Sequence, residues 1–356
     1  LPMALEMAVG NSRQYQTQRE SVYLSALSLT GERHKFALRF TSASVDLERT
    51  KSNGKPDTTS DASFTLSKAM KAGGSLTASL ANDLTLYFDG SSPKVPNLTL
   101  ALTQPLLKDA GQKMAQELLT QAERNLVYSI RSYTRYQQTF LVDLTATYLD
   151  LLRQKNKVRD DYSLYLDRIR FRQEQELRLK GELISQYELD QALRSELSAK
   201  DGYIASVASY RGSLDDFKKD LNLPLGRRIV LDDSEMDNLK QLPLDLVPLT
   251  DRYGYQLAMT NRLDVLNEID KFQDKKRKVE VAKNDLLPSL KIVADYSLKD
   301  QYYRVNEFDF GDYSAKAGIA LDLPIDKLSE RNSYRQSRIN FEQQLRSLMK
   351  TLDDLR

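Results

Sequence analysis

The chain has 356 residues, with 52 basic against 50 acidic side chains, so its formal net charge is only +2. It contains no cysteine, which excludes disulfides and thiolate metal sites, and its near-neutral balance gives no electrostatic reason to bind nucleic acid. The single histidine, His34, lies in a polar Arg-His-Lys run and is interpreted as a surface residue, so we predict neither a metal site nor a cofactor.

The first part of the chain changes from helical to strand periodicity. Residues 1–30 have a loose apolar face and predict a helix. Between about 34 and 105, apolar and polar residues alternate in four runs, which predicts strands. Phe36, Leu38 and Phe40 open the first run, Gly73-Gly74 marks a turn in the middle, and Pro105 ends the last.

A very long helical hairpin is predicted over 108–222. Apolar residues recur every three or four positions with no proline between Asp109 and Leu179, and Gly111 falls in the first turn of the expected helix. The pattern breaks at Gly181, where we expect a helix end with this glycine in the left-handed conformation. Ser185 and Glu188 have capping-box spacing and predict that a second helix starts there.

The remainder repeats the order of the first part. Residues 223–250 are rich in Asp and Pro and are predicted to be a connecting segment. A helix over 251–287, strands over 289–323 and a helix over 327–356 follow. The strand ends Leu100–Leu106 and Ile319–Ile325 match, as do Ala8–Asn11 and Ala258–Asn261. We therefore predict two structural repeats, 1–222 and 251–356, each with the order helix, strands, helix.

The strands are two-faced, with apolar residues on one side and Ser, Thr, Lys or Asp on the other. By themselves they favour an ordinary antiparallel sheet over a soluble core rather than a membrane β-barrel. Long helices flank every strand block, however, and so few strands cannot close a barrel alone. In lipid, several chains would have to share one barrel.

At this point the sequence resembles the TolC-like outer-membrane efflux proteins. The resemblance rests on Ala258–Asp264, Val281–Lys283 before Leu287-Pro288, Ile319–Ile325 and the 181–190 tip, and it extends over nearly the whole chain. No single motif is specific, but their order, spacing and duplication are.

The resemblance implies a homotrimer that combines long antiparallel hairpins, forming an α-barrel through the periplasm, with one shared outer-membrane β-barrel. It implies a passive exit duct for efflux or type I secretion, opened by a periplasmic adaptor that links it to an inner-membrane pump or ABC transporter. The implied adaptor-contacting tip is Lys180, Gly181, Glu182, Leu183, Ile184 and Ser185. The implied lipid-facing strand residues are Phe36, Leu38, Phe40, Leu98, Leu100, Leu102, Leu290, Ile292, Ile319 and Leu321.

Two departures from the family pattern leave questions open. The second hairpin tip, which carries the gate in this family, is expected to lie beyond residue 356, so we expect the chain to be a processed or trimmed fragment. The first half also has four strand-like runs where the family has two. Either 36–45 pairs with 97–103 and the middle runs form an extracellular excursion, or 76–88 is itself a barrel strand.

The sequence also allows a soluble scaffold and an enzyme as alternatives. A soluble coiled-coil scaffold with a small β head domain is the alternative function. Against it, six tyrosines on the helix faces suit a wider contact surface than a two-position seam: Tyr128, Tyr133, Tyr136, Tyr148, Tyr162 and Tyr165. Enzymatic activity is not expected. Asp160-Asp161 and Asp215-Asp216 resemble paired carboxylates, but adjacent helix positions point about 100° apart.

Overall fold

The computed structural model describes residues 2–52, 55–87, 94–241, 250–299 and 313–355. The chain forms two compact units, each made of two segments. One comprises Leu1–Ser21 and Ser132–Leu249, and the other comprises Val22–Arg131 and Thr250–Arg356. Helices α2 (Arg13–His34) and α4 (Glu117–Lys180) each contribute residues to both units.

The first unit is a helical hairpin with a small apolar core at its base. It contains α1 (Pro2–Asn11), α5 (Gln186–Asp220), α6 (Ser234–Gln241) and the larger part of α4, which has 64 residues in all. The core is built from α1, α4, α5 and the segment after α5, and consists of Ala8, Leu144, Tyr148, Leu151, Leu152, Phe217, Leu221 and Leu231. Apart from Leu231, which lies in the segment between α5 and α6, these are apolar positions that recur at helical spacing in the sequence.

Aromatic rings hold the two arms of the hairpin together, both within that core and further along the arms. The ring of Tyr148 lies 6.2 Å from Phe217, and the ring of Tyr203 lies 5.2 Å from Tyr162 and 6.5 Å from Tyr165. Arg172 of α4 adds an ion pair with Glu196 of α5. Of the six tyrosines that indicated a wide contact surface, Tyr148, Tyr162 and Tyr165 contact the other arm of the hairpin.

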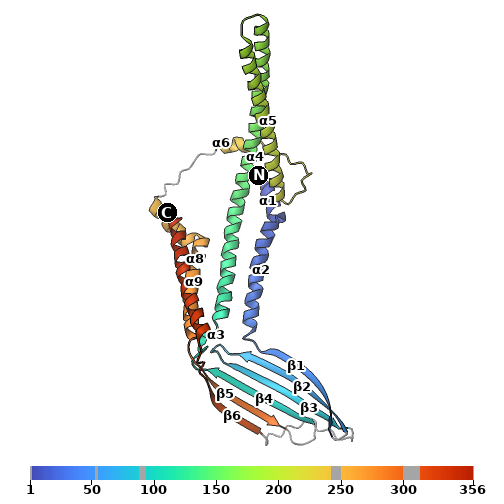
Figure 1. Cartoon of the computed structure of the whole chain (residues 1–356), viewed down its shortest axis with the longest axis vertical. Coiled ribbons are helices and arrows are strands. Elements are labelled where there is room, and N and C mark those ends of the chain that lie inside the picture. The colour runs from blue at the N-terminus through green and yellow to red at the C-terminus, as the bar shows by residue number, and fades with distance from the viewer. Residues whose placement is uncertain (1, 53–54, 88–93, 242–249, 300–312, 356) are drawn as a thin grey trace. The chain divides into compact units, whose positions relative to one another are not determined.

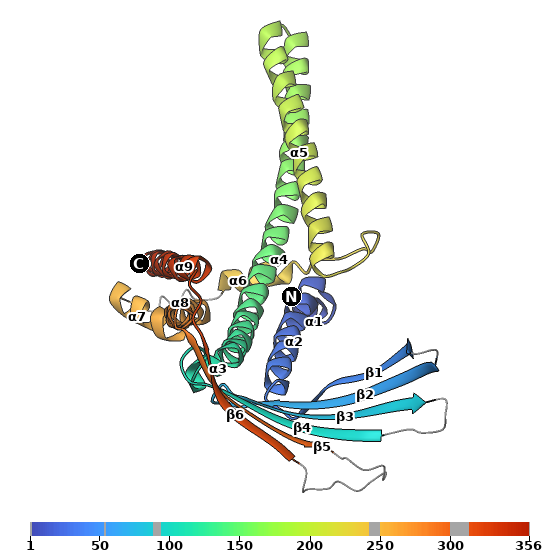
Figure 2. The ribbon, with the colours of Figure 1, turned by 60° about the horizontal axis from the view of Figure 1, so that its bottom comes forward.

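The second unit contains one antiparallel sheet in the order β1-β2-β3-β4-β5-β6 (Figures 1 and 2). Its strands are β1 (Arg39–Ser52), β2 (Lys55–Ala69), β3 (Ser75–Tyr87), β4 (Lys94–Pro105), β5 (Ser289–Lys299) and β6 (Tyr313–Asp322). Pairing of β4 with β5 joins strands from distant parts of the sequence. Helices α8 (Leu263–Asn284) and α9 (Leu328–Asp353) lie at one end of the sheet (Figure 2).

The duplication is visible in the element boundaries. Helices α2 and α8 both have 22 residues, and each follows a shorter helix, α1 or α7 (Asp251–Asn261), after one non-helical residue. Matching turns at 35–38 and 285–288 then lead into β1 and β5. In the second copy α8 packs on α9, with the rings of Phe272 and Phe341 5.1 Å apart.

Three local predictions were wrong. Phe36 lies in the turn after α2, where its N–H donates to Arg33 O, and Leu38 precedes β1, so neither is a strand residue. No proline marks this turn, whereas Pro288 marks its counterpart in the second copy. The long helix also begins later than expected. The positive φ angles of Asp109 (61°) and Gly111 (87°) form a turn before the short helix α3 (Gln112–Ala115), and α4 follows it.

The sheet also decides between the two arrangements left open for the first half. β1 pairs with β2 along its length and not with β4, so the direct pairing of 36–45 with 97–103 is excluded. The run that begins at Leu76 becomes β3, in the middle of the sheet. Among the described residues, no helix is long and apolar enough to cross a membrane.

Candidate functional site: a two-faced sheet and a hairpin tip

One face of the sheet is apolar across all six strands. The register aligns rows such as Phe40–Leu66–Ala78–Leu100–Tyr296–Ala315, and the next row contains Phe64, Leu80, Leu98, Leu298 and Tyr313. Most large side chains on this face are exposed, for example Leu100 at 38% and Ile319 at 72%, whereas Leu298 is buried. A continuous exposed apolar surface of this kind marks contact with a membrane or with another protein.

The opposite face is polar. Hydroxyl groups form a ladder along it, with oxygen atoms 2.7 Å apart for Ser44 and Ser63 and 3.2 Å apart for Thr65 and Ser79. On the neighbouring strands Thr99 lies 3.2 Å from Ser297, and Asp295 lies directly opposite Lys316 in the register. The sheet is therefore amphipathic, with one apolar and one polar face.

A β-bulge maintains this separation on the edge strand β1. The register shifts between Phe40 and Ser42, and the hydroxyl of the extra residue, Thr41, donates to Thr65 O at 3.0 Å. Without the extra residue, Ser42 would lie on the apolar face. With it, Ala43 and Val45 continue that face.

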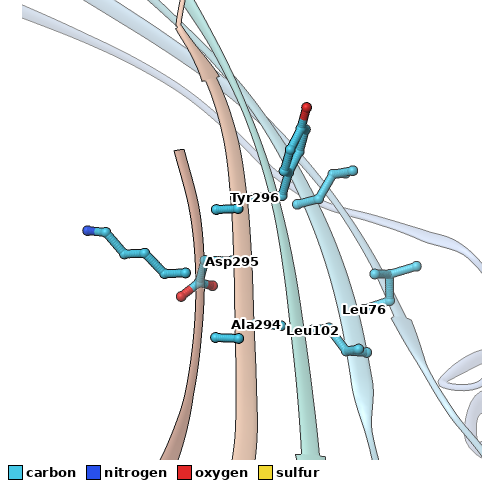
Figure 3. Close-up of a pocket in the computed structure, with 9 residues that line it drawn as sticks. Leu76, Leu102, Ala294, Asp295 and Tyr296 are labelled. Carbon is cyan, nitrogen blue, oxygen red and sulfur yellow. The ribbon is translucent and has the colours of Figure 1, made fainter. Parts of the chain in front are cut away.

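Small side chains leave a shallow hollow in the middle of the sheet. Ala294, Ala315 and Ala317 lie beside larger apolar residues, and the hollow has a volume of about 370 Å³ (Figure 3). Its lining comes from β3, β4, β5 and β6 and consists of Leu76, Leu100, Leu102, Ala294, Asp295, Tyr296, Ala315, Lys316 and Ala317. The lining carries no constellation of polar groups that would orient a small ligand, so we regard the hollow as part of the apolar face.

A charged network that the sequence pattern did not reveal joins α4 to α8 within the second unit. Asp274 is nearly buried and accepts hydrogen bonds from Tyr128 Oη at 2.6 Å and Arg277 at 3.1 Å. Arg124 pairs with Asp274 and with Asp270, which also binds Arg131 at 2.6 Å. Burial, followed by the hydrogen bond to Asp274, raises the pKa of Tyr128 to about 12.

The hairpin tip begins with a Schellman motif at the end of α4. Glu182 N–H donates to Leu179 O and Leu183 N–H donates to Arg178 O, both at 2.9 Å. The left-handed residue is Glu182, with φ 57°, and not Gly181 as the sequence suggested. Gly181, directly after the last residue of α4, still donates its N–H to Leu177 O at 3.2 Å, and a residue with a Cβ occupies the left-handed position that follows.

The second helix of the hairpin begins as predicted, at the N-cap Ser185. The Ser185 N–H donates to Glu188 Oε2 at 2.8 Å, which is the reach-back bond of a capping box, and Ser185 Oγ donates to the same oxygen at 3.0 Å. These two bonds, the backbone one first, hold the pKa of Glu188 below its usual range.

The tip presents apolar side chains to solvent. Leu177, Leu183 and Tyr187 are 68%, 77% and 67% exposed, whereas Ile184 is half-buried. Lys180, Gly181, Glu182 and Ser185 are all exposed, so five of the six predicted tip residues are accessible.

The paired carboxylates do not form a chemical site. Asp161 pairs with Lys157 at 2.7 Å, Asp215 with Lys218 at 2.9 Å and Asp216 with Lys219 at 2.8 Å, each within one helix. Within the described ranges, no cluster of three or more His, Cys, Asp or Glu side chains could hold a metal ion.

Comparison with known proteins gives matches of structure but none of sequence. No family model matches the chain, and no curated protein matches its sequence. Among solved structures, a membrane protein from Pseudomonas aeruginosa is similar, with a TM-score of 0.65 and 13% identity over 99% of this chain and 73% of that one.

Two further structures named as outer-membrane proteins are similar. The Campylobacter jejuni CmeC outer membrane channel has a TM-score of 0.61 and 14% identity, over 99% of this chain and 67% of that one. The outer membrane protein VceC of Vibrio cholerae has a TM-score of 0.64 and 12% identity, over 99% and 75%. At such identities the likeness defines the fold, and it confirms the predicted TolC-like fold of long helices with an antiparallel sheet.

Proposed function

We propose that this chain is one subunit of a homotrimeric outer-membrane exit duct, a passive channel and not an enzyme. The observation that carries the proposal is the six-stranded sheet with one exposed apolar face and one hydroxyl-rich face. The structural neighbours support it, because those named above include an outer membrane channel and an outer membrane protein.

The strands have suitable lengths for a bilayer. The shortest, β6, has 10 residues and the longest, β2, has 15, whereas a tilted membrane strand needs about 9–11. On this proposal the apolar face meets lipid through Phe40, Leu98, Leu100, Leu102, Leu290, Ile292, Ile319 and Leu321, and the polar face lines the lumen. Phe36 and Leu38, which precede β1, would lie at the edge of the bilayer.

An open sheet is not stable in lipid, which is why the proposal requires several copies. The two edge strands, β1 and β6, each have one partner among the described strands. Their unpaired backbone groups have no water to bind in the bilayer core, and each costs several kcal/mol there. Pairing of β1 with β6 of a neighbouring copy removes this cost.

The helical hairpin is proposed to extend into the periplasm and to bind an adaptor protein, and through it an inner-membrane pump. Lys180, Gly181, Glu182, Leu183, Ile184 and Ser185 would form the contact, with Leu183 as its apolar centre. The high exposure of Leu177, Leu183 and Tyr187 supports this role, because a partner that covers them gains their burial. Contact there would open the duct by moving the hairpins.

The duct is tested on the full-length protein extracted in detergent. We expect a detergent-dependent trimer from the outer-membrane fraction that conducts ions in a planar bilayer once the hairpins are loosened. A detergent-free monomer or dimer from the soluble fraction would refute the duct and favour the coiled-coil scaffold.

The adaptor contact is tested with Leu183→Asp. We expect it to abolish export and co-purification of the adaptor while the trimer still forms in the outer membrane. Lys200→Gln, at an exposed position further along α5, is the matched control and should leave both unchanged. Normal adaptor binding by Leu183→Asp would exclude the tip as the contact.

A further inference from the structure

The β2–β3 hairpin lies inside the sheet, between β1 and β4, so the chain contributes six contiguous strands instead of four. β2 pairs with β1 on one side and β3 pairs with β4 on the other, so the four strands of the first half are contiguous. We propose that all six strands of each chain enter the shared barrel, and that three copies close a barrel of 18 strands. This inference rests on the proposed function.

The end of the sheet where α2 leads into β1 and β6 leads into α9 is called the helical end. The turn between β2 and β3 is anchored there. Ala72 O accepts hydrogen bonds from Gly111 N–H at 3.2 Å and from Gln104 Nε2 at 3.3 Å. Gly73 has φ 96°, and a Cβ on Gly74 would lie 2.4 Å from the Gln104 side chain and 2.8 Å from Thr103 O. A turn packed so closely against the end of β4 keeps the hairpin in the sheet.

The hairpin also continues the apolar face between β1 and β4 in the rows that contain Phe64 and Leu66, although Lys68 of β2 pairs with Leu76 on that face. Phe64 and Leu66 of β2 and Leu76 and Leu80 of β3 are directly aligned with the apolar positions of their neighbours, and all four are 39–50% exposed. An extracellular excursion would leave these side chains in water. In the barrel they face lipid, as Leu100 does.

The connectivity allows the copies to join without a parallel pair. β1 starts at the helical end, and β6 ends there, because α2 leads into β1 and β6 leads into α9. The intervening strands alternate in direction, so β1 of one copy and β6 of the next run antiparallel. An even number of strands per chain is required for this, and six meets the requirement as four would.

The register within one chain has the stagger of a closed barrel. Following the paired residues from Arg39 on β1 leads through Ser67, Thr77, Ala101 and Asp295 to Lys316 on β6. β6 continues from Lys316 to Asp322 before it reaches the helical end. The line of paired residues therefore shifts by about six residues along the strands while it crosses about five strand spacings, from β1 to β6. This shift corresponds to a strand tilt of about 40° from the barrel axis, which is within the range of membrane barrels.

The strand number sets the width of the exit. With about 4.8 Å between strands and a tilt of about 40°, 18 strands enclose a backbone diameter of about 36 Å, against about 24 Å for 12 strands. Porins with 16–18 strands leave an aqueous channel at this size. We therefore infer a wider outer-membrane exit than four strands per chain would give.

Lipid contact of β2 provides the test, and the absence of native cysteine makes single labels specific. Leu66→Cys on β2, Leu100→Cys on β4 and the opposite-face control Ser67→Cys carry a fluorophore in the full-length trimer. The protein is reconstituted in phosphatidylcholine vesicles with nitroxide-labelled acyl chains. We expect equal quenching at Leu66→Cys and Leu100→Cys, and little at Ser67→Cys.

The outcomes separate the inference from the proposed function. Quenching at Leu100→Cys without quenching at Leu66→Cys overturns the six-strand barrel and leaves the duct intact, whereas quenching at neither overturns both. A second measurement uses disulfides. Ser44→Cys with Ser63→Cys should crosslink within one chain, and Ser44→Cys with Asn97→Cys should not, because two strands separate them. Efficient crosslinking of the second pair would contradict the proposal.

Discussion

Replacing Asp274 with alanine tests whether the charged network between α4 and α8 holds the helices at the base of the sheet. The Asp274 side chain is 5% exposed and accepts hydrogen bonds from Tyr128 at 2.6 Å, Arg277 at 3.1 Å and Gln121 at 3.2 Å. Losing a buried acceptor with charged partners costs about 3–5 kcal/mol when nothing compensates.

The arginines that pair with Asp274 keep other acidic partners in the variant, which lowers the expected loss of unfolding free energy. Arg124 retains Asp270 at 3.2 Å, and Arg277 retains Glu117 at 2.6 Å. We therefore expect Asp274→Ala to lower the free energy of unfolding by about 2–4 kcal/mol. The assay is denaturant unfolding of the detergent-solubilised protein, followed by the helical circular dichroism signal. Asp167→Ala is the control, because its pair with Arg170 is exposed and should contribute less than about 0.5 kcal/mol.

A double-mutant cycle with Tyr128→Phe isolates the central hydrogen bond. We expect a coupling of about 1–2 kcal/mol between Asp274 and Tyr128. The raised pKa of Tyr128 favours the neutral phenol in the folded state, so its contribution should be complete below pH 10 and be lost as the pH rises through about 12. Zero coupling, or an Asp274→Ala cost no larger than that of Asp167→Ala, would refute the reasoning.

Three further predictions concern the tip and the sheet. Glu182→Gly should stabilise the hairpin by about 0.5–1 kcal/mol by relieving its φ of 57°, while Gly181→Ala should change unfolding by less than about 0.5 kcal/mol; a reversed order would mean that Gly181 is the left-handed residue. Because the pKa of Glu188 is lowered in the folded chain, the stability lost in Glu188→Ala should be present above pH 4.5 and fade as the pH falls below it, which unfolding at several pH values would measure. Leu100→Arg should reduce insertion into the outer membrane, at a cost of about 2–4 kcal/mol, whereas Thr99→Arg on the polar face should insert normally; equal insertion of the two variants would contradict the assignment of faces.

Much of the fold is predictable because it depends on local periodicity. The spacing of Leu144, Tyr148, Leu151 and Leu152 determines which side of α4 is buried, and the same residues form the core of the hairpin. Alternation over β3 and β4 likewise determines which residues share a face. The capping-box spacing of Ser185 and Glu188 identifies the start of α5, because both partners of the bond lie within one turn.

Other features do not follow from residue spacing. Glu182 takes the left-handed position because the bonds of Glu182 and Leu183 to the preceding turn fix where α4 ends, and a nearby glycine gave the opposite indication. The bonds of Asp274 to Tyr128 and Gln121 join positions far apart in sequence, so no spacing rule identifies them. The candidate site also has a part that the sequence predicts and a part that it does not. The faces of the strands were predictable from the alternation of residues, whereas the exposure of Leu183 could be seen only in the tertiary structure.

The sequence by itself determined the two-faced strands, the long hairpin and the duplication, because a period of two or 3.6 residues is a property of neighbours along the chain. Only the tertiary structure decided that β1 pairs with β2 and not with β4. Both arrangements put apolar residues on one face and hydroxyls on the other, so hydrophobic burial does not distinguish them. The choice depends on the Gly73-Gly74 turn, where only residues without a Cβ let the hairpin pack against the end of β4 and take its place in the sheet.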